Sequence, residues 1–106
     1  MPDTRYPMPA YVIVEVNVTN PEPYAAYRDL ATASVARHGG RFLVRGGQVT
    51  PLEGDWQPPR FVVIEFPSVD AAKAFYFSED YQEALQVRLA NSVGRSFIVE
   101  GYAPAG

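Results

Sequence analysis

The sequence contains no cysteine and only one histidine among its 106 residues. Without cysteine, the chain can form no disulfide bond, use no thiolate nucleophile and offer no Cys-ligated zinc or iron–sulfur site. One histidine leaves little for an imidazole-based metal site or for haem ligation. We therefore expect neither a metal nor a cofactor.

Basic residues and long apolar runs are also scarce. Nine Lys and Arg stand against twelve Asp and Glu, which gives a formal net charge of −3 and argues against a nucleic-acid binder. No run approaches the roughly 20 apolar residues of a membrane span, and the N-terminus lacks the basic and apolar segments of a signal peptide. We expect a cytoplasmic protein without nucleic-acid or membrane partners.

The pattern of β-branched runs, caps and breakers predicts an α+β protein. Asn20 before Pro21 is typical of a helix start, Ser68 and Ser78 are candidate N-caps, and Gly39 is a candidate helix end. The predicted order β-α-β-β-α-β is the ferredoxin-like arrangement with a four-stranded antiparallel sheet. We expect strands at 11–18, 41–45, 60–66 and 96–102, helices at 21–38, 68–77 and 79–90, a loop at 51–59, a single domain over 10–102, an N-terminal extension at 1–9 and a tail at 103–106.

Alternation along the strands separates two faces of this sheet. The set expected to face the helices is wholly apolar: Val12, Val14, Val16, Val18, Phe42, Val44, Val62, Ile64, Phe66, Phe97 and Val99. The opposite set mixes charged residues with Ile13, Leu43, Phe61, Val63 and Ile98. A face open to water would not normally carry so many apolar side chains, and the chain has no third layer to cover it. We therefore predict a homodimer that packs sheet against sheet.

Several segments together resemble a known family. They are AYVIVEVNVTNPEPYAAYRDL, HGGRFLVRGG, and the later pattern that joins LEGDW to RFVVIEFPS, between about Ala10 and Gly101. The sequence resembles the family catalogued as domain of unknown function 1330, of the dimeric α+β barrel superfamily. The resemblance implies a ferredoxin-like subunit and a sheet-to-sheet dimer, but no reaction. Related families include cofactor-independent monooxygenases, haem-degrading enzymes, muconolactone isomerases and ligand-binding modules, so the fold does not select a chemistry.

His38 is the candidate acid–base residue. It follows Tyr24, Tyr27 and Ser34 at helical spacing, which points it toward the sheet or its rim. One interpretation is structural, because a cation is favoured at a helix C-terminus by roughly 0.3–1 kcal/mol. The other is a general base, since the unperturbed pKa of histidine is near ~6.5.

Three arginines gather in the stretch RHGGRFLVRGG at 37–47. The glycine pairs are best explained as a helix end and a bend in a strand, because their spacing matches no nucleotide-binding loop. Arg41 and Arg45 are expected on one side of their strand, the side away from the helices. They could pair with Glu15, Glu65 or Glu100, or act together as a clamp for a carboxylate or phenolate.

Aromatic residues supply the remaining candidates for a binding site. Trp56 could pin its own loop or close over a ligand, and Tyr27 and Tyr76 could form apolar walls or belong to the core. Arg88 lacks an acidic residue at helical spacing before it and is expected to be solvated.

Two hypotheses for function follow. In the first, a pocket between sheet and helices binds a small aromatic or carboxylate-bearing metabolite through His38, Arg41 and Arg45. In the second, the same pocket belongs to a cofactor-independent monooxygenase or isomerase, where His38 takes a proton and the arginines stabilise the resulting anion.

Overall fold

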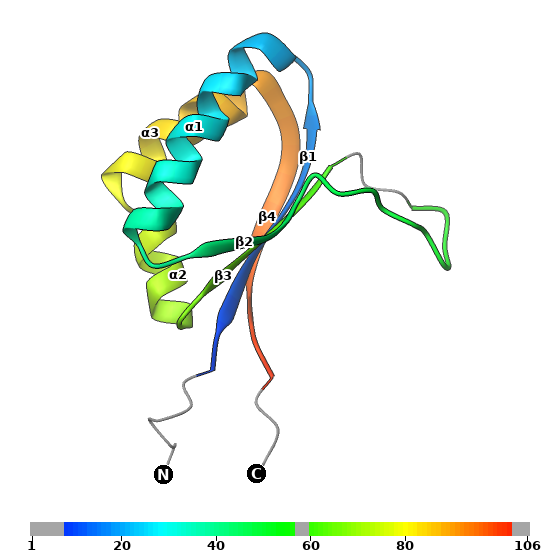
Figure 1. Cartoon of the computed structure of the whole chain (residues 1–106). Coiled ribbons are helices and arrows are strands. Elements are labelled where there is room, and N and C mark those ends of the chain that lie inside the picture. The colour runs from blue at the N-terminus through cyan, green and yellow to red at the C-terminus, as the bar shows by residue number, and fades with distance from the viewer. Residues whose placement is uncertain (1–7, 57–59, 103–106) are drawn as a thin grey trace.

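The computed structural model describes residues 8–56 and 60–102. Residues 1–7 of the expected N-terminal extension, the expected tail and the last three residues of the expected loop lie outside the described residues. The elements are β1 (Ala10–Val18), α1 (Pro21–Arg37), β2 (Arg41–Arg45), β3 (Phe61–Phe66), α2 (Val69–Tyr76), α3 (Glu79–Asn91) and β4 (Ser92–Glu100). The strands form an antiparallel sheet in the order β2-β3-β1-β4, and the helices lie on one face of it (Figure 1). The ferredoxin-like prediction is confirmed, with its second helical connection divided between α2 and α3.

Local sequence explains where the helices begin and end. The Ser68 hydroxyl accepts the Ala71 N–H at 3.0 Å before α2, and the Ser78 hydroxyl accepts the Tyr81 N–H at 3.3 Å before α3. Asn20 occupies the cap position of α1 without a side-chain cap bond. Gly39 follows α1 with a φ of 77°, a left-handed conformation that glycine adopts without strain.

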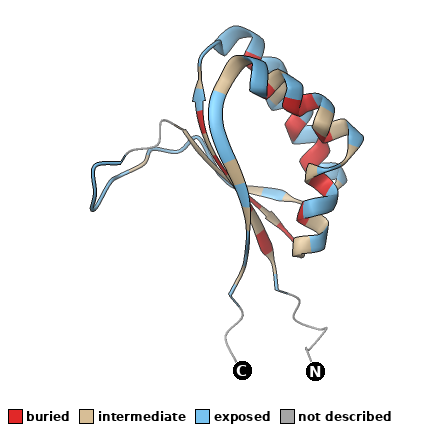
Figure 2. Ribbon diagram, turned by 180° about the vertical axis from the view of Figure 1, so that it is seen from behind, coloured by how far each residue is buried: buried red, intermediate tan, exposed pale blue. Residues whose placement is uncertain are grey.

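The core fills the space between the helices and one face of the sheet. Val12, Val14 and Val16 of β1 are buried beneath α2 and α3 residues, and the rings of Phe66 and Phe75 lie 4.9 Å apart at its centre. Figure 2 shows the buried residues gathered along these facing surfaces. The alternation on β1 and β3 therefore predicted the core correctly.

Strand β4 differs from its prediction in both start and phase. It begins at Ser92, directly after α3, four residues before the predicted start at Ser96, because its pairing with β1 runs through Val18↔Ser92. Val12 pairs with Ile98, so Ile98 faces the helices. Phe97 lies opposite Ile13 on the other face and is 47% exposed. Residues 97–99 are all apolar and lie on an edge strand. Without an alternation of polar and apolar residues, the sequence did not specify which of them face the helices.

A bulge in β2 also places Arg45 on the opposite side of the sheet from the one expected. Phe42 pairs with Ile64 on the helix-facing side, and the register then shifts so that Val44 pairs with Val63. Arg45 consequently lies opposite Val62 and turns toward the helices, whereas Arg41 stays on the opposite face. The two arginines do not share a side, because the extra residue of a bulge inverts the alternation that follows it.

The face of the sheet away from the helices, called the open face below, has an ordered pattern. Four apolar residues in register cross all four strands: Val44, Val63, Ile13 and Phe97. We call them the apolar row. Ion pairs flank it, Arg41 to Glu65 at 2.8 Å on one side and Arg95 to Glu15 at 3.0 Å on the other.

None of the helices in the described part of the chain has the length and apolar character needed to cross a bilayer.

Candidate functional site

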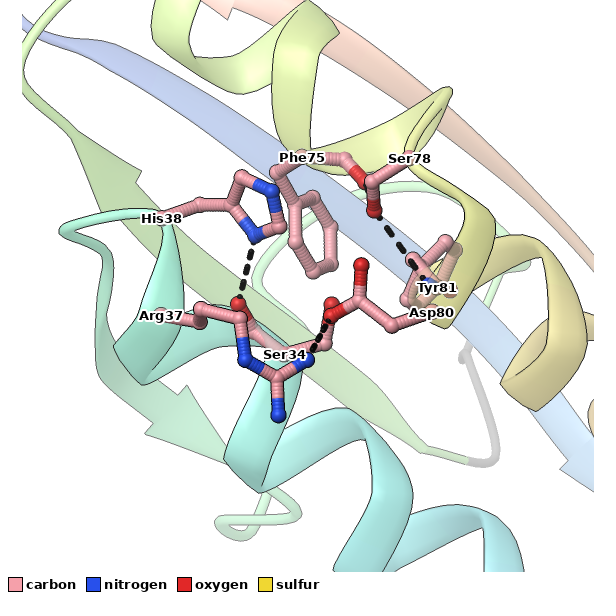
Figure 3. A network of polar contacts seen from close by, with 7 residues as sticks. All are labelled: Ser34, Arg37, His38, Phe75, Ser78, Asp80 and Tyr81. Atoms are coloured by element: carbon pink, nitrogen blue, oxygen red, sulfur yellow. Dashed lines mark hydrogen bonds and ion pairs between the residues drawn. The ribbon is translucent and has the colours of Figure 1, made fainter.

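His38 lies at the C-terminal end of α1, half-buried, with its ring edge-on to Phe75 at 6.0 Å between centroids (Figure 3). Its Nδ1 lies 2.8 Å from the Ser34 carbonyl oxygen. Because a carbonyl oxygen can only accept, Nδ1 carries the proton in this contact. In the neutral ring, Nε2 is then the acceptor. The ring is turned away from bulk water, as expected, but its contacts are with α1 itself and with Phe75 of α2.

The residues around His38 join α1 to the start of α3. Arg37 donates a charged hydrogen bond to Asp80. The Ser34 hydroxyl is buried and makes no hydrogen bond of regular geometry with the described residues. Its proximity is nevertheless the largest of the effects that lower the pKa of Asp80 to about 2, with Ser78 and Arg37 adding to it. This arrangement stabilises the packing of α1 against the start of α3.

Arg41 is on the open face, exposed, with its Nε bonded to Glu65. This contact matches the ion-pair alternative for Arg41. A cavity of about 570 Å³ adjoins it, lined by Pro9, Gly39, Gly40, Arg41, Glu65, Phe66 and Pro67. Arg41 and Arg45 cannot clamp one ligand, since they project from opposite faces of the sheet.

Arg45 reaches toward α1. One terminal nitrogen donates to the Arg28 carbonyl oxygen at 3.0 Å, and the guanidinium carbon lies 4.0 Å above the centre of the Phe42 ring. Partial burial lowers the pKa of Arg45, and the neighbouring charges of Arg28 and Arg60 lower it further. The bulge therefore turns Arg45, an exposed residue, toward the helix side, where its guanidinium bonds the backbone of Arg28.

Tyr27 joins this region from α1. Its hydroxyl lies 2.8 Å from the Tyr81 hydroxyl of α3, and its ring is 5.3 Å from that of Tyr24. Burial, reinforced by Tyr81, raises the pKa of Tyr27 well above its usual range. The hydroxyl therefore stays protonated at any ordinary pH and can act as a hydrogen-bond donor or acceptor, but not as a base.

Two further arginines in this region were not predicted. Arg88 is only 4% exposed, which contradicts the expected solvated position. Arg60 lies beside β1, where its carbonyl accepts the Val16 N–H at 3.0 Å. In both, Nε is buried and donates to no acceptor among the described residues. Burial raises the pKa of Tyr24, and the charges of Arg60 and Arg88 oppose that rise.

The spacing of residues in the sequence could have indicated that both Arg88 and Arg60 face the interior. Arg88 follows Tyr81, Ala84 and Leu85 at the i, i+3, i+4, i+7 spacing of one helix face, and all three are buried. Arg60 precedes Val62 and Ile64 in the alternation of the helix-facing side. The absence of a charge partner on the same helix suggested solvation, whereas the helix face on which Arg88 lies determines its burial.

These side chains form what we call the arginine–tyrosine cluster: Tyr24, Tyr27 and Arg28 of α1, Arg45 and Arg60 from the sheet side, and Tyr81 and Arg88 of α3. The largest charge effects on Tyr24, Tyr27 and Arg45 come from arginines and tyrosines, and no ion pair among the described residues involves Arg28, Arg45, Arg60 or Arg88. Guanidinium groups donate hydrogen bonds and cannot accept them. The cluster is thus a positively charged, donor-rich region in a chain of net negative charge.

Trp56 and Tyr76 lie elsewhere. Trp56 is 52% exposed in the segment between β2 and β3, which projects from the sheet away from the helices (Figure 1). Tyr76 ends α2, 5.5 Å from the Tyr81 ring, and contributes to a mostly apolar cavity of about 250 Å³ with Val12, Phe77, Ser96, Phe97 and Ile98. Of these two residues, Tyr76 contacts the cluster, through the ring of Tyr81. Among residues 8–56 and 60–102, no three His, Asp or Glu side chains converge as a metal site would require.

The fold occurs in several solved structures. A protein of unknown function from Rhodopseudomonas palustris superposes with a TM-score of 0.74 at 23% identity, over 92% of this chain and 85% of its own. SnoaB, a cofactor-independent oxygenase from Streptomyces nogalater, superposes with a TM-score of 0.65 at 13% identity, over 92% and 96%. At such identities the likeness concerns the fold alone. Among curated proteins, none matches this chain.

The sequence pattern of one family matches residues 9–102, nearly the whole chain. That family is described as a domain of unknown function, DUF1330. The resemblance drawn from the strand and helix motifs is thereby confirmed, and the chain belongs to the DUF1330 family.

Proposed function

We propose that this protein binds a small aromatic or carboxylate-bearing metabolite between its sheet and its helices. The observation that carries the proposal is the arginine–tyrosine cluster. Arg45 of β2, Arg60 just before β3 and Arg88 of α3 supply charged donors, and Tyr24 and Tyr27 of α1 supply aromatic surface. Guanidinium groups match the planar geometry of carboxylates, and tyrosine rings suit an aromatic body. Of the anchors expected from the sequence, Arg45 and Tyr27 belong to this region.

We also propose that the protein is a homodimer that packs the open faces of two sheets together. The apolar row supports this, since Phe97 and Val44 are 47% and 39% exposed in the single chain. The projecting segment between β2 and β3 adds Leu52, 92% exposed, on the same side of the sheet. Its position is suited to reach over a second copy, and the resemblance to the dimeric α+β barrel superfamily points to the same surface.

Native mass spectrometry of the protein as purified from cells tests both proposals. We expect a species near twice the chain mass of 11.7 kDa that carries an additional small-molecule mass. A Glu in place of Ile13 would put a charge in the apolar row, so Ile13→Glu should shift the spectrum to the single chain. An unchanged dimer in that variant would exclude the open face as the interface.

Catalysis on the same cluster is the second candidate, and the fold shared with the oxygenase SnoaB is what favours it. The expected base does not support it. His38 is ten residues beyond Arg28 on α1, which corresponds to about 15 Å along the helix axis. Oxygen uptake with phenolic substrates would test it, and uptake lost in His38→Ala with ligand binding retained would favour catalysis over binding alone.

A further inference from the structure

We infer that the ligand is an oxyanion, a carboxylate or a phosphate, that pairs with the buried guanidinium of Arg88, and that it carries no ammonium group near this anion. The inference rests on the proposed binding function and specifies the chemistry of its ligand. It is drawn from the burial of Arg88 and from its buried Nε, which has no hydrogen-bond partner among the described residues.

The first step concerns charge. Arg88 carries a guanidinium group and is only 4% exposed, so a cationic side chain is almost fully buried here. A buried charge is costly unless an opposite charge or strong acceptors compensate it. The three ion pairs among the described residues use Arg37, Arg41 and Arg95. Arg88 has no carboxylate partner among them.

The second step concerns hydrogen bonds. Nε of Arg88 and Nε of Arg60 are both buried with no acceptor in the described structure. The Tyr27–Tyr81 pair uses one hydroxyl proton for its own bond, which leaves the proton of the accepting hydroxyl available to a third group. Each of these groups can donate a hydrogen bond. The complementary ligand atom is therefore an acceptor oxygen without a hydrogen.

The third step concerns selectivity. A ligand ammonium group near Arg88 would meet its positive charge and that of Arg60, and no ion pair among the described residues neutralises either arginine. Arg28 and Arg45, which are exposed, add further positive charge. Like charges in a partly buried region repel strongly because solvent screens them poorly. An aromatic carboxylate fits both the guanidinium groups and the rings of Tyr24 and Tyr27, whereas phosphate would use the guanidinium groups alone.

Thermal unfolding with four probes tests the inference: benzoate, its neutral isostere benzamide, the cation benzylammonium, and inorganic phosphate. We expect benzoate to raise the melting temperature by about 5 °C at ten times its Kd, with benzamide and benzylammonium without effect. In Arg88→Met the benzoate shift should disappear. The control Arg37→Met removes the same charge from the far end of α1 and should retain the shift. A shift with phosphate but not with benzoate, also lost in Arg88→Met, would support the oxyanion and assign it to phosphate.

Other outcomes separate the two proposals. Equal shifts with benzoate and benzamide would overturn the oxyanion while binding between sheet and helices stands. A benzoate shift that persists in a folded Arg88→Met would give Arg88 a structural role and overturn the inference. Absence of any shift with all four probes would overturn the binding proposal itself.

A conservative variant keeps the test decisive if Arg88→Met does not fold. Arg88→Lys keeps the charge but loses Nε and the planar fork. If Arg88→Met fails to fold by circular dichroism, Arg88→Lys should fold and weaken benzoate binding by at least about tenfold. Unchanged affinity in Arg88→Lys would overturn the inference.

Discussion

Gly46 links the backbone of β2 to the arginine–tyrosine cluster, and replacing it with alanine should disturb both. Its φ is +76°, in the left-handed region, where a side chain costs about 1–2 kcal/mol. A Cβ at this position would lie 2.8 Å from one terminal nitrogen of Arg60 and 3.0 Å from its guanidinium carbon. Ordinary contacts are about 3.5–4.0 Å, so the guanidinium would have to move by about 1 Å.

The adjacent glycine provides a matched control. A Cβ at Gly47 would meet nothing within 4 Å, and its φ is not positive. Gly47→Ala should therefore be neutral or stabilise by about 0.4–1 kcal/mol, because it restricts the unfolded chain. Gly46→Ala should destabilise by about 1–3 kcal/mol, since the strained backbone adds to the displaced side chain.

Urea unfolding, followed by circular dichroism, measures the difference between the two variants in free energy of unfolding. Benzoate titration of the same proteins measures the second effect, and we expect weaker binding in Gly46→Ala than in Gly47→Ala because Arg60 has moved. Equal stability of the two variants would refute the backbone argument. Lower stability with unchanged affinity would remove Arg60 from the binding site.

Three further predictions follow from other parts of the molecule. Gly94→Ala should destabilise by about 3 kcal/mol in urea unfolding, because its Cβ would lie 2.1 Å from the Glu15 carbonyl oxygen, and native-like stability would mean that β4 does not approach β1 so closely. Ile13→Glu should convert the dimer to a monomer in light scattering, whereas Glu22→Gln on exposed α1 should not. Asp80 has a lowered pKa, so its contribution to stability is present above the unfolded value near ~3.9 and is lost as pH falls toward 2. Wild type should therefore exceed Asp80→Asn in stability at pH 6 and converge with it near pH 2, and a constant difference would contradict the assignment.

Much of the fold followed from local chemistry. Strand β1, helix α1 and the caps at Ser68 and Ser78 were predicted within a few residues, because each depends on propensities and turn residues that act over short range. Alternation also identified the core of β1 and β3. These features could be predicted without knowing which helices pack against which strands.

The site was predicted less well, and the reasons are specific. The bulge in β2 moved Arg45 to the helix side, and a one-residue change of register inverts every later side chain. Arg88 lay on a predictable helix face, but burial of an arginine contradicts the usual preference of charged residues for solvent. His38 was correctly expected to turn away from bulk water, where it packs on Phe75 of α2, yet its distance from the arginines depends on how the helices cross the sheet, which local patterns do not specify.

The central claim is that an oxyanion pairs with the buried arginines between sheet and helices. The most direct test is an NMR titration of the arginine Nε–H resonances with benzoate. We predict a large, saturable shift of the Arg88 and Arg60 resonances with one common Kd, while Arg37 and Arg95, which are already paired, stay in place. Shifts confined to Arg37 and Arg95, or no saturable shift at Arg88, would contradict the account.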